Sequence, residues 1–187
     1  MKNLMEWFLR RFTYVKKLEQ TAFYDDLTGL LRRGRFFEVL SNAVERARRS
    51  SGYHIVVYYI DFNGFKAIND TYGHGVGDKY LRFVANSLST FVAKVPGVFL
   101  GRMGGDEFAL FQKIWAGSVY YLPSENGRRI HDYLAGLEYC DRDTAIRCCA
   151  SVGHSTTVET GFDPDLLIAA ADKEMFSAKR RVRHERR

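Results

Sequence analysis

The sequence predicts one α+β domain of ferredoxin-like type, in which an antiparallel-containing central sheet is flanked by helices. First, the chain has 187 residues, the usual length of a single domain, and 46% of them are hydrophobic, enough for a core. Second, strand patterns alternate with helical patterns along the chain. Third, two adjacent strand patterns are separated by Gly104 and Gly105, which predicts an antiparallel hairpin because tight hairpin turns need positive φ.

The first predicted element is a helix over residues 4–22. Apolar residues recur there every three or four positions, as in Phe8, Phe12 and Val15. An isolated helix of this length is marginal in water, so it needs a partner. We expect an N-terminal helical extension that acts as a stalk or dimerising helix, and the alternative is a helix packed against its own domain.

A turn at residues 25–29 leads to a predicted helix over 35–48. Residues 54–60 are β-branched and aromatic, which predicts a central strand that ends at Asp61. A short helical turn is expected around Phe65. The glycine-rich residues 73–77 then precede a helix that runs to about residue 92, with Asp78 expected as its N-cap.

In the second half, strands over 98–102 and 106–111 form the predicted hairpin, and residues 113–124 show no regular pattern. A helix over 125–137, a strand over 145–154 and a helix over 163–181 complete the chain. The sequence has no repeat, and no linker splits off a second domain. We therefore expect an N-terminal helix over 1–22, one domain over 23–184 and a basic tail over 185–187.

Composition and charge exclude several classes of protein. A charged fraction of 27% is ordinary for a globular chain and excludes a disordered or collagen-like one. The longest clean apolar run, residues 55–60, is far shorter than the roughly 20 residues of a membrane span. Residues 1–18 mix charged and apolar side chains, unlike a signal peptide. We therefore expect a cytoplasmic domain without a membrane span.

The net charge of +6 does not indicate a nucleic-acid partner. Six of the 28 basic residues and one of the 22 acidic residues lie from Lys179 to the C-terminus, so the rest of the chain is nearly neutral. Such a tail suits phosphate or solvent. The three cysteines, Cys140, Cys148 and Cys149, form no C-x-x-C pair. We expect buried, reduced thiols, the last two on opposite faces of a strand.

Acidic residues follow two of the predicted strands. Asp61 ends the central strand, and Asp106 and Glu107 follow the glycine pair of the hairpin. If the two elements are neighbours in one sheet, three carboxylates converge and repel one another unless a cation or proton offsets them. Mg²⁺ or Mn²⁺ suits such oxygen ligands, and two of these ions promote phosphoryl transfer. The alternative is that these are unrelated surface acids near strand ends.

Four motifs together resemble the GGDEF family, the diguanylate cyclases. The family signature is matched by residues 104–108, preceded by Arg102 and Met103. The family's D-x-D-x-F-K-x-I-N-D segment is similar to residues 61–70, and T-Y-G-H-x-x-G-D is similar to 71–78. D-x-L-T-G-L matches residues 25–30, and the closing helix also has counterparts here, so the resemblance spans about residues 20–184. It implies the palm-type form of the predicted fold.

The resemblance implies a role for each matched residue. Asp61, Asp106 and the backbone carbonyl of Phe62 would hold Mg²⁺ (or Mn²⁺), two ions per active site, and Glu107 would be a further catalytic acid. Among the substrate-binding residues, Gly104 and Gly105 would leave the turn open to substrate, and Asn69 and Asp78 would bind guanine. Phe65 would also contact the substrate. The basic side chains would bind the triphosphate: Lys66, Lys179 and Arg183.

The implied activity is the condensation of two GTP molecules into cyclic di-GMP and two pyrophosphates. Each 3′-hydroxyl would attack the α-phosphate held by the partner subunit, so the reaction requires a homodimer. Members of the family usually carry a sensory domain upstream, and we expect one in the full-length protein. The alternative is a catalytically silent GGDEF domain that binds GTP and regulates a partner.

Some positions depart from the family pattern. Asn63 replaces the second Asp of D-x-D, Arg32 stands where Asn is usual, and the closing helix has Glu174, Val182 and His184 at unusual positions. The family's product-inhibition motif, R-x-x-D, corresponds to residues 95–98, which carry no charge. We therefore expect no product-inhibition site.

Overall fold

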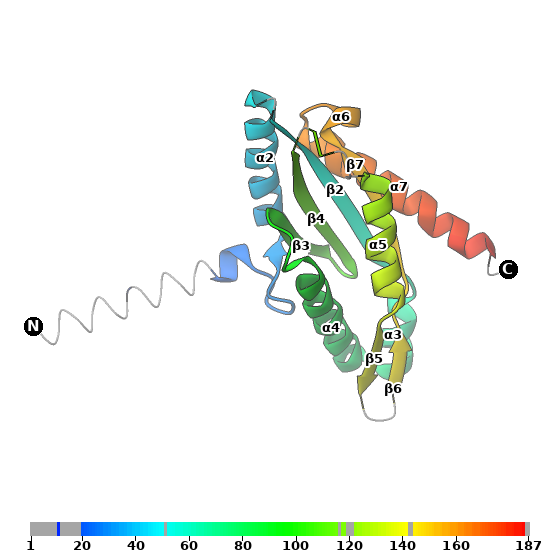
Figure 1. Ribbon diagram of the computed structural model, residues 1–187. Coiled ribbons are helices and arrows are strands. Elements are labelled where there is room, and N and C mark those ends of the chain that lie inside the picture. The colour runs from blue at the N-terminus through cyan, green and yellow to red at the C-terminus, as the bar shows by residue number, and fades with distance from the viewer. Residues whose placement is uncertain are drawn as a thin grey trace, which may run out of the picture.

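The computed structural model describes residues 11, 20–50, 52–115, 117–118, 122–141 and 144–185 (Figure 1). Side chains are described up to residue 181. Most of the predicted N-terminal helix over 1–22 and of the basic tail over 185–187 lies outside these residues, so both stay predictions.

The described chain confirms the predicted α+β fold, with a mixed five-stranded sheet in the order β1-β3-β4-β2-β7. The strands are β1 (Leu31–Arg32), β2 (Tyr53–Phe62), β3 (Val98–Gly104), β4 (Glu107–Trp115) and β7 (Ala150–Thr156). β1 pairs with β3 in parallel, and the other pairs are antiparallel. The long strand β2 therefore lies inside the sheet, as its apolar run predicts.

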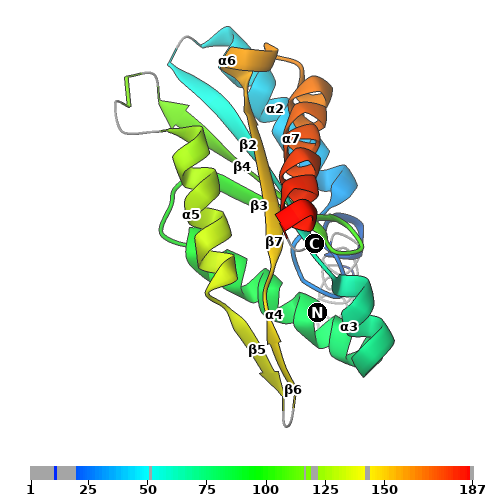
Figure 2. The same cartoon turned by 90° about the vertical axis from the view of Figure 1, so that its right-hand side faces the viewer.

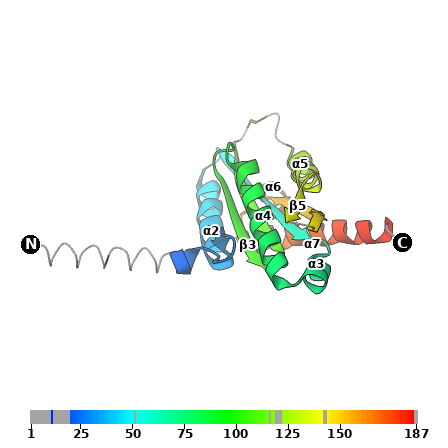
Figure 3. The same ribbon diagram turned by 90° about the horizontal axis from the view of Figure 1, so that it is seen from below.

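Helices cover both faces of this sheet. α4 (His74–Val92) and α5 (Pro123–Ala135) pack on one face, and α2 (Arg33–Arg49) and α7 (Pro164–Glu185) pack on the other (Figure 2). The short helices α3 (Phe65–Tyr72) and α6 (Thr157–Thr160) follow β2 and β7. The last turns of α7 extend beyond the sheet (Figure 3).

The two-sided cover explains why β2 reads as an unbroken apolar run. Val56 and Tyr58 belong to the core under α4 and α5, whereas Val57 and Tyr59 belong to the core under α2 and α7. A strand buried on both faces needs apolar or aromatic residues at every position instead of every second one. The run ends at Asp61, which is 6% exposed.

The expected N-cap role of Asp78 is wrong. α4 begins at His74, directly after Gly73, so Asp78 lies in the second turn of the helix. Gly73 has a φ of 82°, a left-handed value that favours glycine and separates α3 from α4. The glycine-rich stretch is therefore mostly helical instead of a loop.

The single strand expected over 145–154 is also wrong. β5 (Glu138–Asp141) and β6 (Thr144–Arg147) form a separate hairpin, and β7 begins only at Ala150. Cys148 and Cys149 lie between β6 and β7 instead of within a strand. Cys148 is buried as expected, but Cys140 is exposed.

The stretch 113–124 is partly regular, contrary to the sequence-based expectation. β4 continues to Trp115, and α5 begins at Pro123. From Gln112 onward no residue of β4 is fully buried, and Trp115 is 65% exposed, so this part of the strand leaves little periodic pattern in the sequence.

Candidate active site

The acidic residues lie at one end of the two central strands. Asp61 of β2 is directly opposite Glu107 of β4, and Asp106 is in the turn just before β4. The backbone N–H of Phe62 donates to the carbonyl of Asp106 at 3.2 Å. Because the N–H and C=O of one residue in an antiparallel strand point to the same side, the Phe62 carbonyl also faces the Asp106 segment.

The turn beside these acids requires its two glycines. Gly104 has a φ of 147° and Gly105 a φ of 51°, values that residues with a Cβ rarely adopt. A Cβ placed on either glycine would meet no atom within 4 Å, so the space over the turn is open. A substrate could therefore lie against the backbone at this turn.

Asp61 and Asp106 are electrostatically coupled. Burial raises the pKa of Asp106, and the negative charge of Asp61 raises it further, while Lys179 and Arg102 act in the opposite direction. The Nζ atom of Lys179, on α7, lies 2.5 Å from the Oδ1 atom of Asp61, and both side chains are largely buried. The structure thus brings together two carboxylates and one of the expected phosphate-binding lysines.

Glu107 points toward a different neighbour. The Tyr59 hydroxyl donates to its Oε2 atom at 3.0 Å. Burial raises the pKa of Tyr59 well above its usual range, and Glu107 raises it further by charge and hydrogen bond. The sequence pattern gave no reason to assign Tyr59 to the site.

These groups fit a divalent cation only together with a substrate. In the described part of the chain, no three His, Cys, Asp or Glu side chains are close enough to hold a metal ion. Mg²⁺ usually takes one or two protein carboxylates together with waters and substrate phosphates. Asp61, Asp106 and the Phe62 carbonyl match that pattern, and the repulsion between the two acids favours a cation there.

The expected guanine-binding residues lie on α3 and α4. The Oδ1 atom of Asn69 is buried and has no hydrogen-bond partner. It lies against Gly77, where a Cβ would come within 1.9 Å of it. The next residue along α4, Asp78, is exposed. Phe65 stacks on Tyr80 with ring centroids 6.2 Å apart, beside the same glycine. An unpaired buried acceptor, an exposed carboxylate and an aromatic ring are therefore close together.

The structure says less about two other residues that are expected to bind phosphate. Lys66 is an exposed residue of α3. Arg183 lies in the last turns of α7, and its side chain is outside the described residues.

The function of the D-x-L-T-G-L motif becomes clear only in the structure. Asp25 accepts hydrogen bonds from Thr28, through the backbone N–H at 2.9 Å and the hydroxyl at 2.7 Å. It also accepts one from Arg102 at 3.0 Å, and the Arg102 guanidinium donates to the Gly105 carbonyl. Sequence analysis missed this link, although the joint presence of both motifs was a signal. Asp25 therefore stabilises the glycine turn through Arg102.

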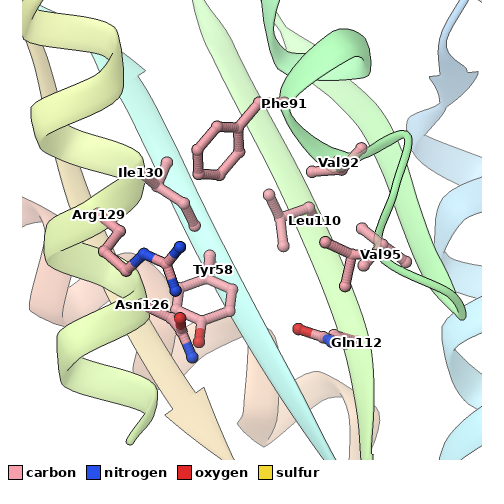
Figure 4. Close-up of a pocket in the computed structure, with 10 residues that line it drawn as sticks. Tyr58, Phe91, Val92, Val95, Leu110, Gln112, Asn126, Arg129 and Ile130 are labelled. Atoms are coloured by element: carbon pink, nitrogen blue, oxygen red, sulfur yellow. The ribbon is translucent and has the colours of Figure 1, made fainter. Parts of the chain in front are cut away.

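A cavity of about 340 Å³ lies between α4 and α5, on the sheet face opposite Glu107 (Figure 4). Phe91, Leu110 and Ile130 contribute apolar walls, and Arg129 lies at its edge. Val95 and Val98, at the two charged positions of the family's product-inhibition motif, line it as well.

Comparison with known proteins shows to which family the chain belongs. The family described as "Diguanylate cyclase, GGDEF domain" matches residues 22–185. The chain belongs to the GGDEF family of diguanylate cyclase domains. In the described part of this GGDEF domain, no helix is both long and apolar enough to cross a membrane.

Its relatives include the signaling protein YkoW of Bacillus subtilis, 31% identical over 92% of this chain and 21% of that protein. The diguanylate cyclase DgcP of Pseudomonas aeruginosa is 30% identical over 95% of this chain and 26% of that protein. The GGDEF domain thus spans only about a fifth to a quarter of these two relatives.

Solved structures share the fold. A sensory box/GGDEF family protein from Caulobacter crescentus has 32% identity and a TM-score of 0.75, covering 84% of this chain and 97% of that one. The coiled coil and GGDEF domain of DgcB from the same organism, solved in complex with c-di-GMP, has a TM-score of 0.80 at 24% identity, covering 96% and 92%. The latter likeness supports the palm-like fold alone.

Proposed function

We propose that this GGDEF domain is an active diguanylate cyclase that condenses two GTP molecules into cyclic di-GMP and two pyrophosphates. The observation that carries the proposal is the coupled pair Asp61 and Asp106, beside an open glycine turn and with Lys179 against Asp61. Degenerate members of such a family would be expected to lose these acids, and this chain keeps both as well as Glu107.

The proposed metal ligands are Asp61, Asp106 and the Phe62 carbonyl, which would hold Mg²⁺ or Mn²⁺, two ions per site. When bound, these ions would neutralise phosphate charge and favour ionisation of the attacking hydroxyl. Asp61, Asp106 and the Phe62 carbonyl would hold the ions, and with them the triphosphate, at the end of the two central strands.

The proposed nucleotide-binding residues divide between base and phosphates. Asp78 can accept hydrogen bonds from the N1–H and N2–H₂ donors of guanine, a pair that adenine lacks. The Asn69 amide can bond the acceptors of guanine, and its Oδ1 atom is still unpaired in the structure. Phe65 would line the base site, and Lys66, Lys179 and Arg183 would bind phosphates.

The proposed reaction needs two subunits. Each binds one GTP, and each 3′-oxygen attacks the α-phosphorus of the partner's GTP. A P–O bond forms, the bond from the α-phosphorus to the bridging oxygen breaks, pyrophosphate leaves and the hydroxyl proton is lost. Glu107 is the carboxylate proposed at the attacking hydroxyl, where it would accept the proton that the hydroxyl loses. A face-to-face homodimer supplies the orientation that a monomer cannot.

The test is mass spectrometry of the nucleotides after concentrated protein is incubated with GTP and Mg²⁺. We expect cyclic di-GMP from the wild type and none from Asp106→Ala. Asp132→Ala removes an exposed carboxylate on α5 and should retain activity. If a demonstrated dimer binds GTP tightly but forms no product, the silent regulatory domain replaces the cyclase.

A further inference from the structure

We propose that Tyr59 is a positioning residue that orients the Glu107 carboxylate for the reaction. The inference rests on the proposed cyclase function, because it assigns Glu107 a role in catalysis. Tyr59 would touch neither substrate nor metal and would act only through the acid that accepts its hydroxyl hydrogen.

The register of the sheet explains how the two side chains meet. Tyr59 of β2 is paired with Ala109 of β4, and Glu107 lies two residues before Ala109 in β4, on the same face. Diagonal neighbours of this kind are within reach of an aromatic side chain. Because Ala109 is small, the phenol ring can lie along the sheet, and its hydroxyl donates to Glu107 Oε2 at 3.0 Å.

The phenol ring of Tyr59 lies in the core, whereas the Glu107 carboxylate lies at the candidate active site. Tyr59 is 8% exposed and belongs to the core cluster under α2 and α7, together with Phe36 and Leu167. A glutamate has three rotatable side-chain bonds, so without a partner its carboxylate would sample several directions. A hydrogen bond from a core residue to an ionised acceptor restricts that sampling.

A hydrogen-bond donor at Glu107 offsets a nearby like charge. Glu107 is directly opposite Asp61, and like charges at paired positions repel each other. Asp172 on α7 adds a negative charge near Tyr59, and Arg33 of α2 a positive one. The positive charge of Lys179 is engaged in an ion pair with Asp61. Among the described residues, Tyr59 is the hydrogen-bond donor found at the Glu107 carboxylate.

A buried strand position does not itself need a hydroxyl. The neighbours Val57 and Ile55 on the same face are aliphatic and fully buried. A tyrosine there must find a partner for its O–H, since an unpaired buried hydroxyl is costly. The partner is a signature acid of the family, which is why we assign the hydroxyl to the active site and not to packing.

The kinetic test compares Tyr59→Phe with Tyr58→Phe. Tyr58 is the preceding residue of β2 and is also buried, but it faces α4 and α5. We expect Tyr59→Phe to lower kcat for cyclic di-GMP formation about tenfold, the effect of one lost hydrogen bond to a charged group, with an unchanged KM for GTP. Tyr58→Phe should retain kcat. Equal kcat values for the two variants, with only a lower Tm in Tyr59→Phe, would overturn the inference.

A spectroscopic test needs no turnover. The ring doublet of tyrosine in ultraviolet resonance Raman spectra reports whether the hydroxyl donates to a strong acceptor. The difference spectrum between wild type and Tyr59→Phe isolates Tyr59. We expect it to show a strong donor and to lose that signature in a Glu107→Ala background. An unchanged signature in that background would contradict the inference, whether or not the wild type makes cyclic di-GMP.

Discussion

Asp25 is a residue whose charge state is set by two opposing effects. Burial acts to raise its pKa, but the hydrogen bonds from Thr28 and Arg102 outweigh burial, so the pKa lies below the ordinary value of 3.8. A carboxyl group whose pKa is lowered by folding stabilises the protein above its ordinary pKa, and this contribution is lost as the pH falls through the lowered value.

We therefore expect Asp25→Asn to destabilise the domain by about 1.5–3 kcal/mol at pH 7, the range for hydrogen bonds to a charged group. The difference from the wild type should shrink as the pH falls below about 4. Urea unfolding at both pH values measures it. An equal difference at pH 7 and at acid pH would show that the charge of Asp25 contributes nothing.

At Gly77, the lack of a Cβ atom leaves room for the Asn69 side chain. The Gly77 backbone is helical, so alanine would normally favour the helix. Here, however, a Cβ would lie 1.9 Å from Asn69 Oδ1 and displace that side chain. We expect Gly77→Ala to weaken GTP binding by about tenfold, the value of one good hydrogen bond to the base.

Gly75→Ala is the matched control for that measurement. Gly75 lies in the same helix, and a Cβ there would meet nothing within 4 Å. Calorimetric titration with GTP should give wild-type affinity for Gly75→Ala. The same affinity for Gly77→Ala would show that Asn69 does not bind the nucleotide.

At the scale of the elements, the sequence predicted those features of strands and turns that depend on a local residue pattern. The run of β2, the glycine hairpin and the place of Asp61 at a strand end all follow from nearby residues. The bonds from Tyr59 to Glu107 and from Arg102 to Asp25 could not be predicted, because they join residues 48 and 77 positions apart. The break between β6 and β7 was missed because apolar residues continue through Cys148 and Cys149.

The packing of α7 on β7 determines where Lys179 lies. At Gly153 of β7, a Cβ would come within 2.1 Å of the Met175 backbone nitrogen and 2.3 Å of the Ala171 carbonyl. Because those atoms are backbone, they cannot move aside as a flexible side chain could. The glycine therefore allows α7 to approach the sheet and bring Lys179 to Asp61.

We expect Gly153→Ala to destabilise the domain by about 3 kcal/mol, the upper part of the range for overpacking. Gly127→Ala on α5 is the control, since its Cβ would make only ordinary contacts with Tyr58 at 3.6 Å. Urea unfolding of both variants checks this. Comparable stability of the two would mean that α7 does not lie as close to β7 as the structure has it.

At the scale of the whole molecule, the acids and the cavity between α4 and α5 are separate sites. Val95 and Val98, which line the cavity, offer no charge to a phosphate. We expect added cyclic di-GMP to leave the initial rate of the cyclase unchanged at concentrations well above that of the protein. Strong inhibition, measured as loss of pyrophosphate release, would show a product-binding site that these residues do not predict.

The central claim is that Asp61 and Asp106 form one cation site together with GTP. The most direct measurement is titration with Mn²⁺ in the presence of a non-hydrolysable GTP analogue, followed by electron paramagnetic resonance of free Mn²⁺. We predict binding by the wild type and a loss of about tenfold or more in affinity in Asp61→Asn, since a charged ligand is replaced by a neutral one. Equal Mn²⁺ affinity in the two proteins would contradict the account.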